Sequence, residues 1–211
     1  YDSWSMSLYD IDPGADCPEI VRMIVEIPKN SANKYEYDGD LGVFRLDRAL
    51  YSAVHYPGDY GFIPGTLMDE AQGGDGDALD LFVLCPALPV GAVLEVEPIG
   101  IIELIDENAR DDKLVALPVD RGLLTMDVDD IRELPKGVEE ILLTWLTHYD
   151  PMDSAQVIGV KGKEAAKRAL AAIGAQKPKL VLVFDETAKY QNSNALLEGV
   201  CSVVDSKVVH G

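Results

Sequence analysis

The chain is poor in cysteine and in basic residues, and it has no long apolar run. Its three cysteines, Cys17, Cys85 and Cys201, are far apart and odd in number. This pattern fits neither a disulfide framework nor a zinc-ligand spacing. No stretch approaches the length of a membrane span, and no signal-peptide pattern is present. We therefore expect a reduced, cytoplasmic compartment and no membrane partner.

Basic residues are outnumbered: 18 Lys and Arg stand against 37 Asp and Glu, for a formal net charge of −19. Such a surface repels nucleic acid and anionic lipid, so no nucleic-acid partner is expected. It would also repel a polyanionic substrate, unless bound cations and local Lys and Arg side chains reverse the field at the binding site. The 211 residues, 47% of them hydrophobic, suffice for one sizeable core and a small appendage.

Short apolar or alternating stretches between Gly, Pro and Asp turns predict about six β-strands, at residues 20–27, 34–38, 43–48, 80–84, 93–105 and 114–119. Pro98 and Gly100 predict a bend or bulge in the longest of them. Apolar residues at helical spacing after Pro135, which fits helix position N1, predict one helix, and an alanine-rich stretch ending at Gly174 predicts another. We expect an α+β fold, a small closed β-barrel with flanking helices.

The end of the chain is apolar enough to pack. Residues 180–184 predict a further strand, and residues 195–204 predict a short helix. We therefore divide the chain into a main domain, residues 1–177, and a C-terminal extension, residues 178–211. The extension is expected to pack on the barrel or on a neighbouring subunit.

Three aspartates, Asp75, Asp77 and Asp80, fall within six positions of the stretch G-G-D-G-D-A-L-D-L-F-V-L. Carboxylates this close repel one another and cost stability unless a cation lies between them. Oxygen ligands suit hard cations such as Mg²⁺, which often shares a phosphate with the protein. In an extended segment Asp75 and Asp77 would point the same way. The alternative is a solvated acidic turn, and the glycine and glutamate offsets of an EF-hand loop are not met.

Other candidate residues have ordinary explanations when each is taken alone. Asp106 and Asp111 flank a loop between two predicted strands, where a solvated polar hairpin is the usual explanation. Arg48 shares a strand face with Phe44 and Leu46, so it points toward the core side. There it either extends its head to solvent or binds a phosphate in a bidentate manner.

The same holds for the remaining candidates. Lys34 and Glu36 share a strand face and could form a weak ion pair. Tyr149 ends the apolar helix stripe, where a core tyrosine is the commoner case. Tyr56 and Tyr60 flank a Pro-Gly turn, where they can donate hydrogen bonds to an anion or cover a core.

Taken together, the motifs occur in a distinctive order: I-V-E-I-P, K-Y-E, D-R, Y-P-x-x-Y-G-F-I-P, D-G-D-x-L-D, D-x-x-x-x-D-x-K, and an aromatic helix ending in H-Y. In this order they resemble the family I soluble inorganic pyrophosphatases, over roughly residues 10–175. The resemblance implies a five-stranded oligonucleotide-binding-type (OB-type) barrel over residues 1–177. It also implies a Mg²⁺-dependent hydrolase that splits pyrophosphate into two phosphates, and a homo-oligomer, commonly a hexamer.

The resemblance further implies a role for each motif residue. The metal ligands would be Asp75, Asp80, Asp106, Asp111 and Glu26. Asp77 would accept the proton of the attacking water. The groups that hold or line the phosphate site would be Lys34, Arg48, Lys113, Tyr149 and Tyr60. The supporting residues would be Glu36 and Tyr56.

The sequence departs from the family pattern at several positions. Ala78 replaces the usual Pro, residues 68–74 form a longer segment, and Asp150 and Gln156 stand where phosphate-binding lysines are usual. Cations that could compensate are Lys161, Lys163 and Lys189. The lost lysines motivate a second hypothesis, a catalytically weakened pyrophosphatase-like barrel that serves as a binding or regulatory module.

Overall fold

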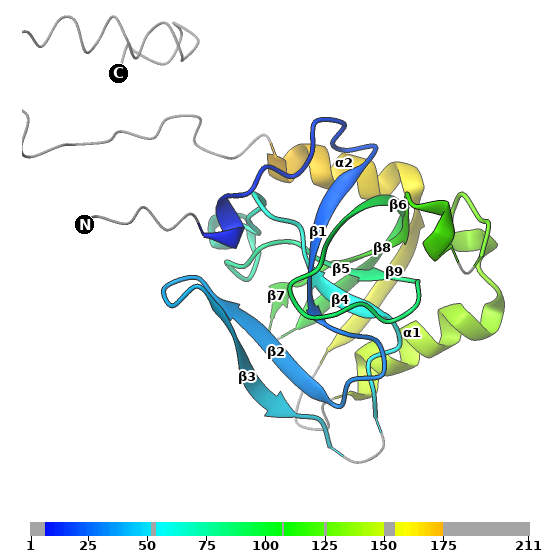
Figure 1. Ribbon diagram of the computed structural model, residues 1–211. Helices are drawn as coiled ribbons and strands as arrows, with labels where there is room; N and C mark the ends of the chain where they lie inside the picture. The colour runs from blue at the N-terminus through cyan, green and yellow to red at the C-terminus, as the bar shows by residue number, and fades with distance from the viewer. Residues whose placement is uncertain (1–6, 52–53, 107, 125, 150–154, 175–211) are drawn as a thin grey trace, which may run out of the picture. The chain divides into compact units, whose positions relative to one another are not determined.

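The computed structural model describes residues 7–51, 54–106, 108–124, 126–149 and 155–174 (Figure 1). Its strands are β1 (Val21–Ile27), β2 (Asn33–Asp38), β3 (Val43–Ala49), β4 (Asp59–Phe62), β5 (Asp80–Val83), β6 (Val93–Asp106), β7 (Ala109–Arg110), β8 (Lys113–Pro118) and β9 (Gln156–Gly162). Its α-helices are α1 (Lys136–His148) and α2 (Lys163–Gly174), and its 3₁₀ turns are η1 (Leu8–Asp10), η2 (Glu70–Gln72), η3 (Arg121–Leu123) and η4 (Ile131–Glu133). The strand and helix predicted at residues 180–184 and 195–204 lie outside the described residues.

Hydrogen bonds of the main sheet form a closed ring through five strands. β1 pairs with β4, β4 with β5, β5 with β8, β8 with β6, and β6 returns to β1. All of these pairings are antiparallel except the parallel pairing of β5 with β8. The expected closed five-stranded arrangement with two helices is therefore confirmed. β9 and β7 both pair with β6 and extend the sheet beyond the ring.

The ring contains one strand that the sequence did not predict. β4 is four residues long, lies in a Gly- and Pro-rich stretch, and is buried along its whole length, so it has no alternation of polar and apolar residues. Gly61 in its centre is required by close packing, because a Cβ atom there would lie 1.9 Å from the carbonyl oxygen of Ile24. β9 was also not predicted, since it is an edge strand with little burial.

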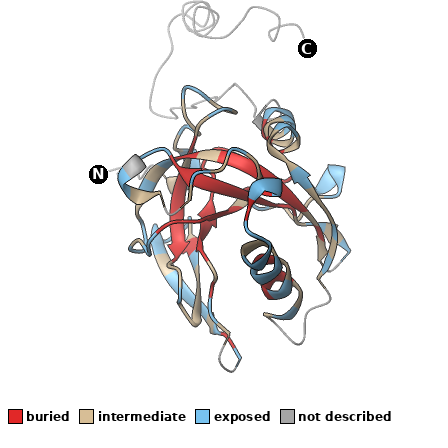
Figure 2. Cartoon of the chain, turned by 90° about the vertical axis from the view of Figure 1, so that its right-hand side faces the viewer, coloured by how far each residue is buried: buried red, intermediate tan, exposed pale blue. Residues whose placement is uncertain are grey.

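β2 and β3 form a separate two-stranded hairpin beside the ring (Figure 1). Figure 2 shows burial concentrated in the ring strands, whereas the hairpin is mostly exposed or half-buried. The expected face of Phe44, Leu46 and Arg48 is only partly directed toward the core. Phe44 packs against Tyr37, but Leu46 is 57% exposed, because no second layer covers the middle of a free hairpin.

The two helices cover separate hydrophobic clusters of the ring. α1 contributes Leu142, Trp145 and Leu146 to one cluster, and α2 contributes Ala166 and Leu170 to the other. Both helices were predicted within a residue or two, although Pro135 is the N-cap of α1 and not its first helical residue.

Several smaller expectations were also tested. The bulge predicted in the long strand is confirmed by a register shift between Pro98 and Gly100 in β6. Cys17 and Cys85 are free thiols, and Cys201 lies outside the described residues. Within the described part of the chain, no helix is long and apolar enough to cross a membrane.

Candidate active site

A cavity of about 500 Å³ lies between the β2–β3 hairpin, the strand ring and the C-terminal end of α1. The structure brings the predicted site residues together there, because each of them lines this one cavity: Glu26, Lys34, Glu36, Arg48, Tyr56, Tyr60, Asp75, Asp77, Asp80, Asp106, Asp111, Lys113 and Tyr149. They come from seven strands, three loops and one helix end. Residues as far apart in the chain as Glu26 and Tyr149 therefore meet in one cavity.

The described lining is strongly acidic. It contains seven carboxylates against three cations, an excess of four negative charges when all are ionised. The cavity is thus negative like the chain as a whole, whose net charge is −19, so an anionic ligand can enter only together with cations.

The aspartate segment is a turn and not the extended strand considered from the sequence. Gly76 adopts a φ of 89°, and the Asp77 N–H donates a 3.0 Å hydrogen bond to Oδ1 of Asp75. Burial, followed by the charges of Asp80 and Glu36, raises the pKa of Asp77. The turn therefore directs two carboxylates into the cavity, and one of them is more basic than an ordinary aspartate.

Lys113, the first residue of β8, lies between two carboxylates. Its Nζ donates to Asp80 Oδ2 at 2.6 Å and to Asp111 Oδ1. Burial alone would lower the pKa of Lys113, but the two carboxylates outweigh it and raise the pKa. The Tyr60 hydroxyl donates to the same Asp80 oxygen at 2.5 Å. A cation thus does lie between the crowded carboxylates, and in this structure it is a lysine ammonium.

Glu26 is the most deeply buried carboxylate of the cavity, with 8% exposure. Its Oε1 accepts a 2.7 Å hydrogen bond from the Tyr37 N–H. Burial, together with the negative charge of Asp80, raises the pKa of Glu26 to about 8. An ionised Glu26 therefore needs a nearby cation.

Asp106 and Asp111 lie on either side of the short β6–β7 hairpin. Burial, and then the adjacent carboxylate of Asp75, raises the pKa of Asp111, although Lys113 partly opposes this shift. The longer segment at residues 68–74 contacts this hairpin directly, because the Arg110 N–H donates to the Gly73 carbonyl at 2.8 Å. The insertion thus joins the aspartate turn to the second acidic loop.

The β2–β3 hairpin provides two of the three cations. Lys34 and Arg48 are opposite each other in register. The Lys34 ammonium lies 2.6 Å from Glu36 Oε1 and 3.6 Å from Asp47 Oδ2, and Arg48 lies 3.8 Å from the same Asp47 oxygen. The weak ion pair considered for Lys34 and Glu36 is present, and both residues also face the cavity.

Comparison with known proteins gives the family. The family model for inorganic pyrophosphatase matches residues 23–178. The chain belongs to the inorganic pyrophosphatase family. It is 38% identical over 161 residues to the inorganic pyrophosphatase of Sulfolobus acidocaldarius, covering 75% of this chain and 90% of that protein. It is 34% identical to that of Gluconobacter oxydans over 178 residues, 82% of this chain and 100% of the relative.

Solved structures of this family share the fold. The crystal structure of the inorganic pyrophosphatase from Thermus thermophilus matches with a TM-score of 0.75 and 36% identity, covering 81% of this chain and 98% of that one. The inorganic pyrophosphatase structure from Helicobacter pylori matches with a TM-score of 0.71 and 34% identity, covering 78% and 96%.

The pyrophosphatase family is generally metal-dependent. The cavity must therefore offer ligands that suit a metal ion. Within the described residues, no three acidic, histidine or cysteine side chains converge closely enough to hold an ion as they stand. The Lys113 ammonium occupies the space between Asp80 and Asp111. The donor set still fits a hard divalent cation, because it is rich in carboxylate oxygens, carries excess negative charge and has raised carboxylate pKa values.

Of the departures from the pyrophosphatase pattern that fall on described residues, one lies in the cavity lining and the others do not. Ala78 lines the cavity. Gln156 is an exposed residue of β9 and is not part of the described lining. Lys161 and Lys163 do not line the cavity either, since they pair with glutamates on the neighbouring strand, Glu103 and Glu97. Asp150 and Lys189 lie outside the described residues.

Among the cavity residues that were not selected from the sequence, two make notable contacts, Trp145 and Tyr9. Trp145 stacks on Tyr149, with ring centroids 4.4 Å apart and an interplanar angle of 10°, and packs on Tyr56 at 4.5 Å. Trp145 could have been found from the sequence, because it lies on the same apolar stripe of the helix as Tyr149. Tyr9 reaches the cavity from η1, and no pattern in the sequence pointed to it, because its neighbours there come from distant segments.

Proposed function

We propose that this protein hydrolyses inorganic pyrophosphate to two phosphates and that Mg²⁺ is its activating ion. The observation that supports this most is the convergence of the predicted site carboxylates, cations and tyrosines on one acidic cavity. The ring of strands is proposed to be an OB-type barrel with flanking helices, the architecture that the family resemblance implies. The residue roles that the family resemblance implies are supported by the chemistry and position of each side chain.

The residues that would hold Mg²⁺ are Asp75, Asp80, Asp106, Asp111 and Glu26. Bound there, the ion would neutralise the crowded carboxylates, lower the pKa of a coordinated water and disperse charge on the phosphates. Lys113 would exchange a carboxylate partner for a phosphate oxygen, which its flexible side chain permits.

Asp77 is assigned as the proton acceptor for the attacking water. It lines the cavity, and burial together with neighbouring negative charge raises its pKa. A general base works best when its pKa approaches the working pH. Asp77 would therefore take the proton onto a carboxylate oxygen that burial and the charges of Asp80 and Glu36 make more basic.

The phosphate groups would be held by Lys34, Arg48, Lys113 and Tyr149, with Tyr60 lining the same side. Arg48 offers a bidentate fork and Lys34 a compact ammonium. Glu36 positions Lys34 through their 2.6 Å contact. Tyr56 supports Tyr149 through the intervening Trp145 ring.

The test is release of phosphate from pyrophosphate with and without Mg²⁺. Asp77→Asn should lower kcat by about 10²–10⁴-fold, the usual contribution of a general base. Asp69→Asn is the matched control, since Asp69 belongs to the adjacent segment and caps η2 outside the cavity. An inactive wild-type protein, or a fully active Asp77→Asn variant, rejects the proposal.

A second candidate is a pyrophosphatase-like barrel with weakened catalysis, acting as a binding or regulatory module. The position of Gln156 outside the cavity favours it, because a cation common in the family is missing from this chain's described lining. Calorimetry with Mg²⁺ and a non-hydrolysable pyrophosphate analogue separates the two candidates, since tight binding without turnover supports the second.

By resemblance we also propose a cytoplasmic homo-oligomer, a hexamer in the commonest form. The extension at residues 178–211 is proposed to pack on the main domain or on a neighbouring subunit. Sedimentation of the full chain and of a chain ending at residue 177 tests both statements.

A further inference from the structure

The turn preceding β1 contributes a side chain to the cavity. This turn is η1, and Ser7 is its N-cap. Tyr9 lines the cavity, and 38% of its surface remains exposed. This turn lies before the segment that matches the family model, which begins at residue 23. What Tyr9 does is therefore a question about this chain in particular.

Tyr9 is bound to the β2–β3 hairpin. Its hydroxyl donates a 3.0 Å hydrogen bond to the Tyr37 carbonyl, and the neighbouring Leu8 N–H donates to the Tyr37 hydroxyl at 3.1 Å. The Tyr9 and Tyr37 rings meet edge to face, with centroids 5.1 Å apart. At the hairpin end, a Cβ atom on Gly39 would lie 3.3 Å from the Tyr9 ring. The turn η1 thus contacts β2 in three ways: through the Leu8 N–H, through the Tyr9 hydroxyl and through the Tyr9 ring.

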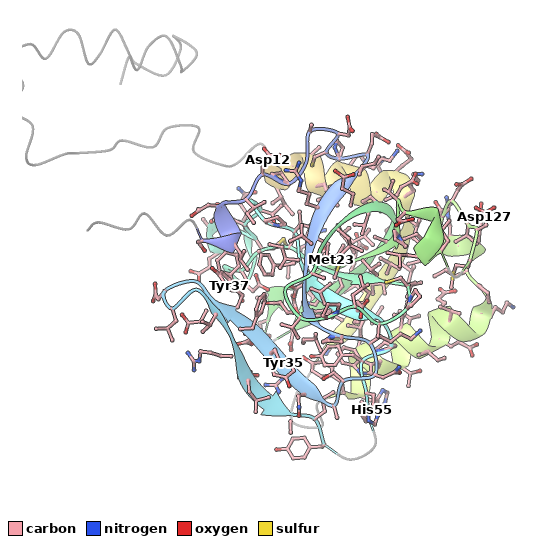
Figure 3. All side chains as sticks on the ribbon, in the orientation of Figure 1. Asp12, Met23, Tyr35, Tyr37, His55 and Asp127 are labelled. Carbon is pink, nitrogen blue, oxygen red and sulfur yellow. The ribbon has the colours of Figure 1, made fainter. Side chains whose placement is uncertain are left out.

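Tyr9 is also bound to the strand ring. The Gly65 N–H, just beyond β4, donates to the Tyr9 carbonyl at 2.8 Å. The Tyr9 ring packs on Phe62 of β4 with centroids 4.8 Å apart. Tyr37, Phe62 and Ile24 form a small core of their own, against which Leu8 packs. Figure 3 labels Tyr37 on the hairpin next to this junction.

This junction matters because the described hairpin forms its own two-stranded sheet and shares no ladder of hydrogen bonds with the ring. The hairpin carries Lys34 and Arg48, whereas the aspartates belong to the ring and its loops. The distance between the cationic and the acidic wall therefore depends on contacts other than a β-ladder, and those of Tyr9 are among them. Tyr37 additionally donates its N–H to Glu26, so the strand that Tyr9 holds also holds this buried carboxylate.

We propose that Tyr9 is a positioning residue for the pyrophosphatase reaction. By joining the hairpin to the ring, it sets the placement of Lys34 and Arg48 opposite the aspartates and keeps the Tyr37 N–H on Glu26. The inference rests on the proposed function for its kinetic consequence. Its structural consequence, the geometry of the carboxylates, does not depend on turnover.

The experiment compares Tyr9→Ala and Tyr9→Phe with the wild-type full chain. Tyr51→Ala is the matched control, because Tyr51 is a 59% exposed tyrosine near the hairpin base and is not part of the cavity lining. Tyr9→Ala should lower kcat/KM about tenfold or more, chiefly through a higher KM, because displacing binding groups by about an ångström is costly. Tyr9→Phe keeps the ring and should recover most of this loss.

A second measurement does not require activity. Calorimetric titration with Mg²⁺ alone should give weaker binding for Tyr9→Ala than for the wild type, and unchanged binding for Tyr51→Ala. Thermal unfolding of each variant ensures that all assays use folded protein. If the wild type does not hydrolyse pyrophosphate, the proposed function fails, while this titration still decides the inference.

The inference is overturned if Tyr9→Ala keeps both the wild-type kcat/KM and the wild-type Mg²⁺ affinity. It is equally overturned if Tyr9→Ala leaves KM unchanged and lowers kcat only in proportion to the fraction of protein that is unfolded. Tyr9 would then contribute to stability alone.

Discussion

Single side chains determine the electrostatics of the cavity. Asp80 and Asp111 raise the pKa of Lys113, and Lys113 in turn opposes the rise that burial causes in the pKa of Asp111. Glu26 is the extreme case, because it is almost fully buried beside another carboxylate. Its charge is stable only in the presence of a cation, so metal binding, pH and stability are linked at this residue.

This linkage predicts a pH dependence for the metal-free protein. The pKa of Glu26 rises from 4.5 to about 8 on folding. Between these values the folded state keeps a proton that the unfolded state has lost, so stability falls as pH rises. The destabilisation is absent below the lower pKa and complete above the upper one, where it is on the order of 5 kcal/mol at most.

Urea unfolding in the presence of a chelator measures this effect. The free energy of unfolding should fall less steeply between about pH 5 and about pH 8 for Glu26→Gln than for the wild type, since the titrating group is removed. Mg²⁺ should also flatten the wild-type curve. Equal slopes for the two proteins without metal would contradict the assignment.

At the scale of elements, β4 is anchored by its first residue. Asp59 is 1% exposed, and its carboxylate accepts the Lys29 N–H at 2.7 Å and the Leu88 N–H at 3.1 Å. The Cys85 thiol donates to the same carboxylate at 3.2 Å. The side chain thereby joins the end of β1, the start of β4 and the loop after β5, and so fixes the strand that presents Tyr60.

Asp59→Ala should therefore destabilise the protein by about 2–4 kcal/mol, because it leaves two backbone N–H groups in the interior without an acceptor. Asp59→Asn retains a carbonyl oxygen and should cost less. Chemical denaturation measures both, with Asp40→Ala, an exposed aspartate on the hairpin turn, as the control. A loss for Asp59→Ala no larger than that of the control would show that the anchor is unimportant.

At the scale of the whole molecule, the residues assigned to the reaction all precede the extension. Among the described residues, the cavity lining runs from Tyr9 to Tyr149, and the match to the pyrophosphatase model ends at residue 178. The main domain should therefore contain the complete catalytic apparatus, whatever the remaining residues contribute to assembly.

Removal of residues 178–211 should leave kcat/KM within about twofold of the wild type, the range of changes distant from a site. Phosphate release measured at several protein concentrations checks this. A loss of activity that deepens on dilution would instead show that the extension stabilises an oligomer on which the reaction depends.

The local sequence predicted much of this protein correctly. Strands with apolar or alternating residues, such as those containing Glu26 and Lys34, were found because their side chains alternate between two environments. The cluster of Asp75, Asp77 and Asp80 indicated a metal site from its chemical character, whereas the roles proposed for Asp111 and Lys113 came from the family resemblance. The strand that begins at Asp59 was missed, because a strand buried on both faces does not alternate polar with apolar residues.

By itself the sequence determined the chemistry of the cavity: the carboxylates, the cations and the tyrosines are the residue types that pyrophosphate hydrolysis requires. Only the tertiary structure decided how they meet. The ring closes by pairing Val21 with Val96, and the free hairpin is held in place by the contacts of Tyr9. Both depend on contacts between residues far apart in the chain, which no local pattern of hydrophobicity or charge encodes.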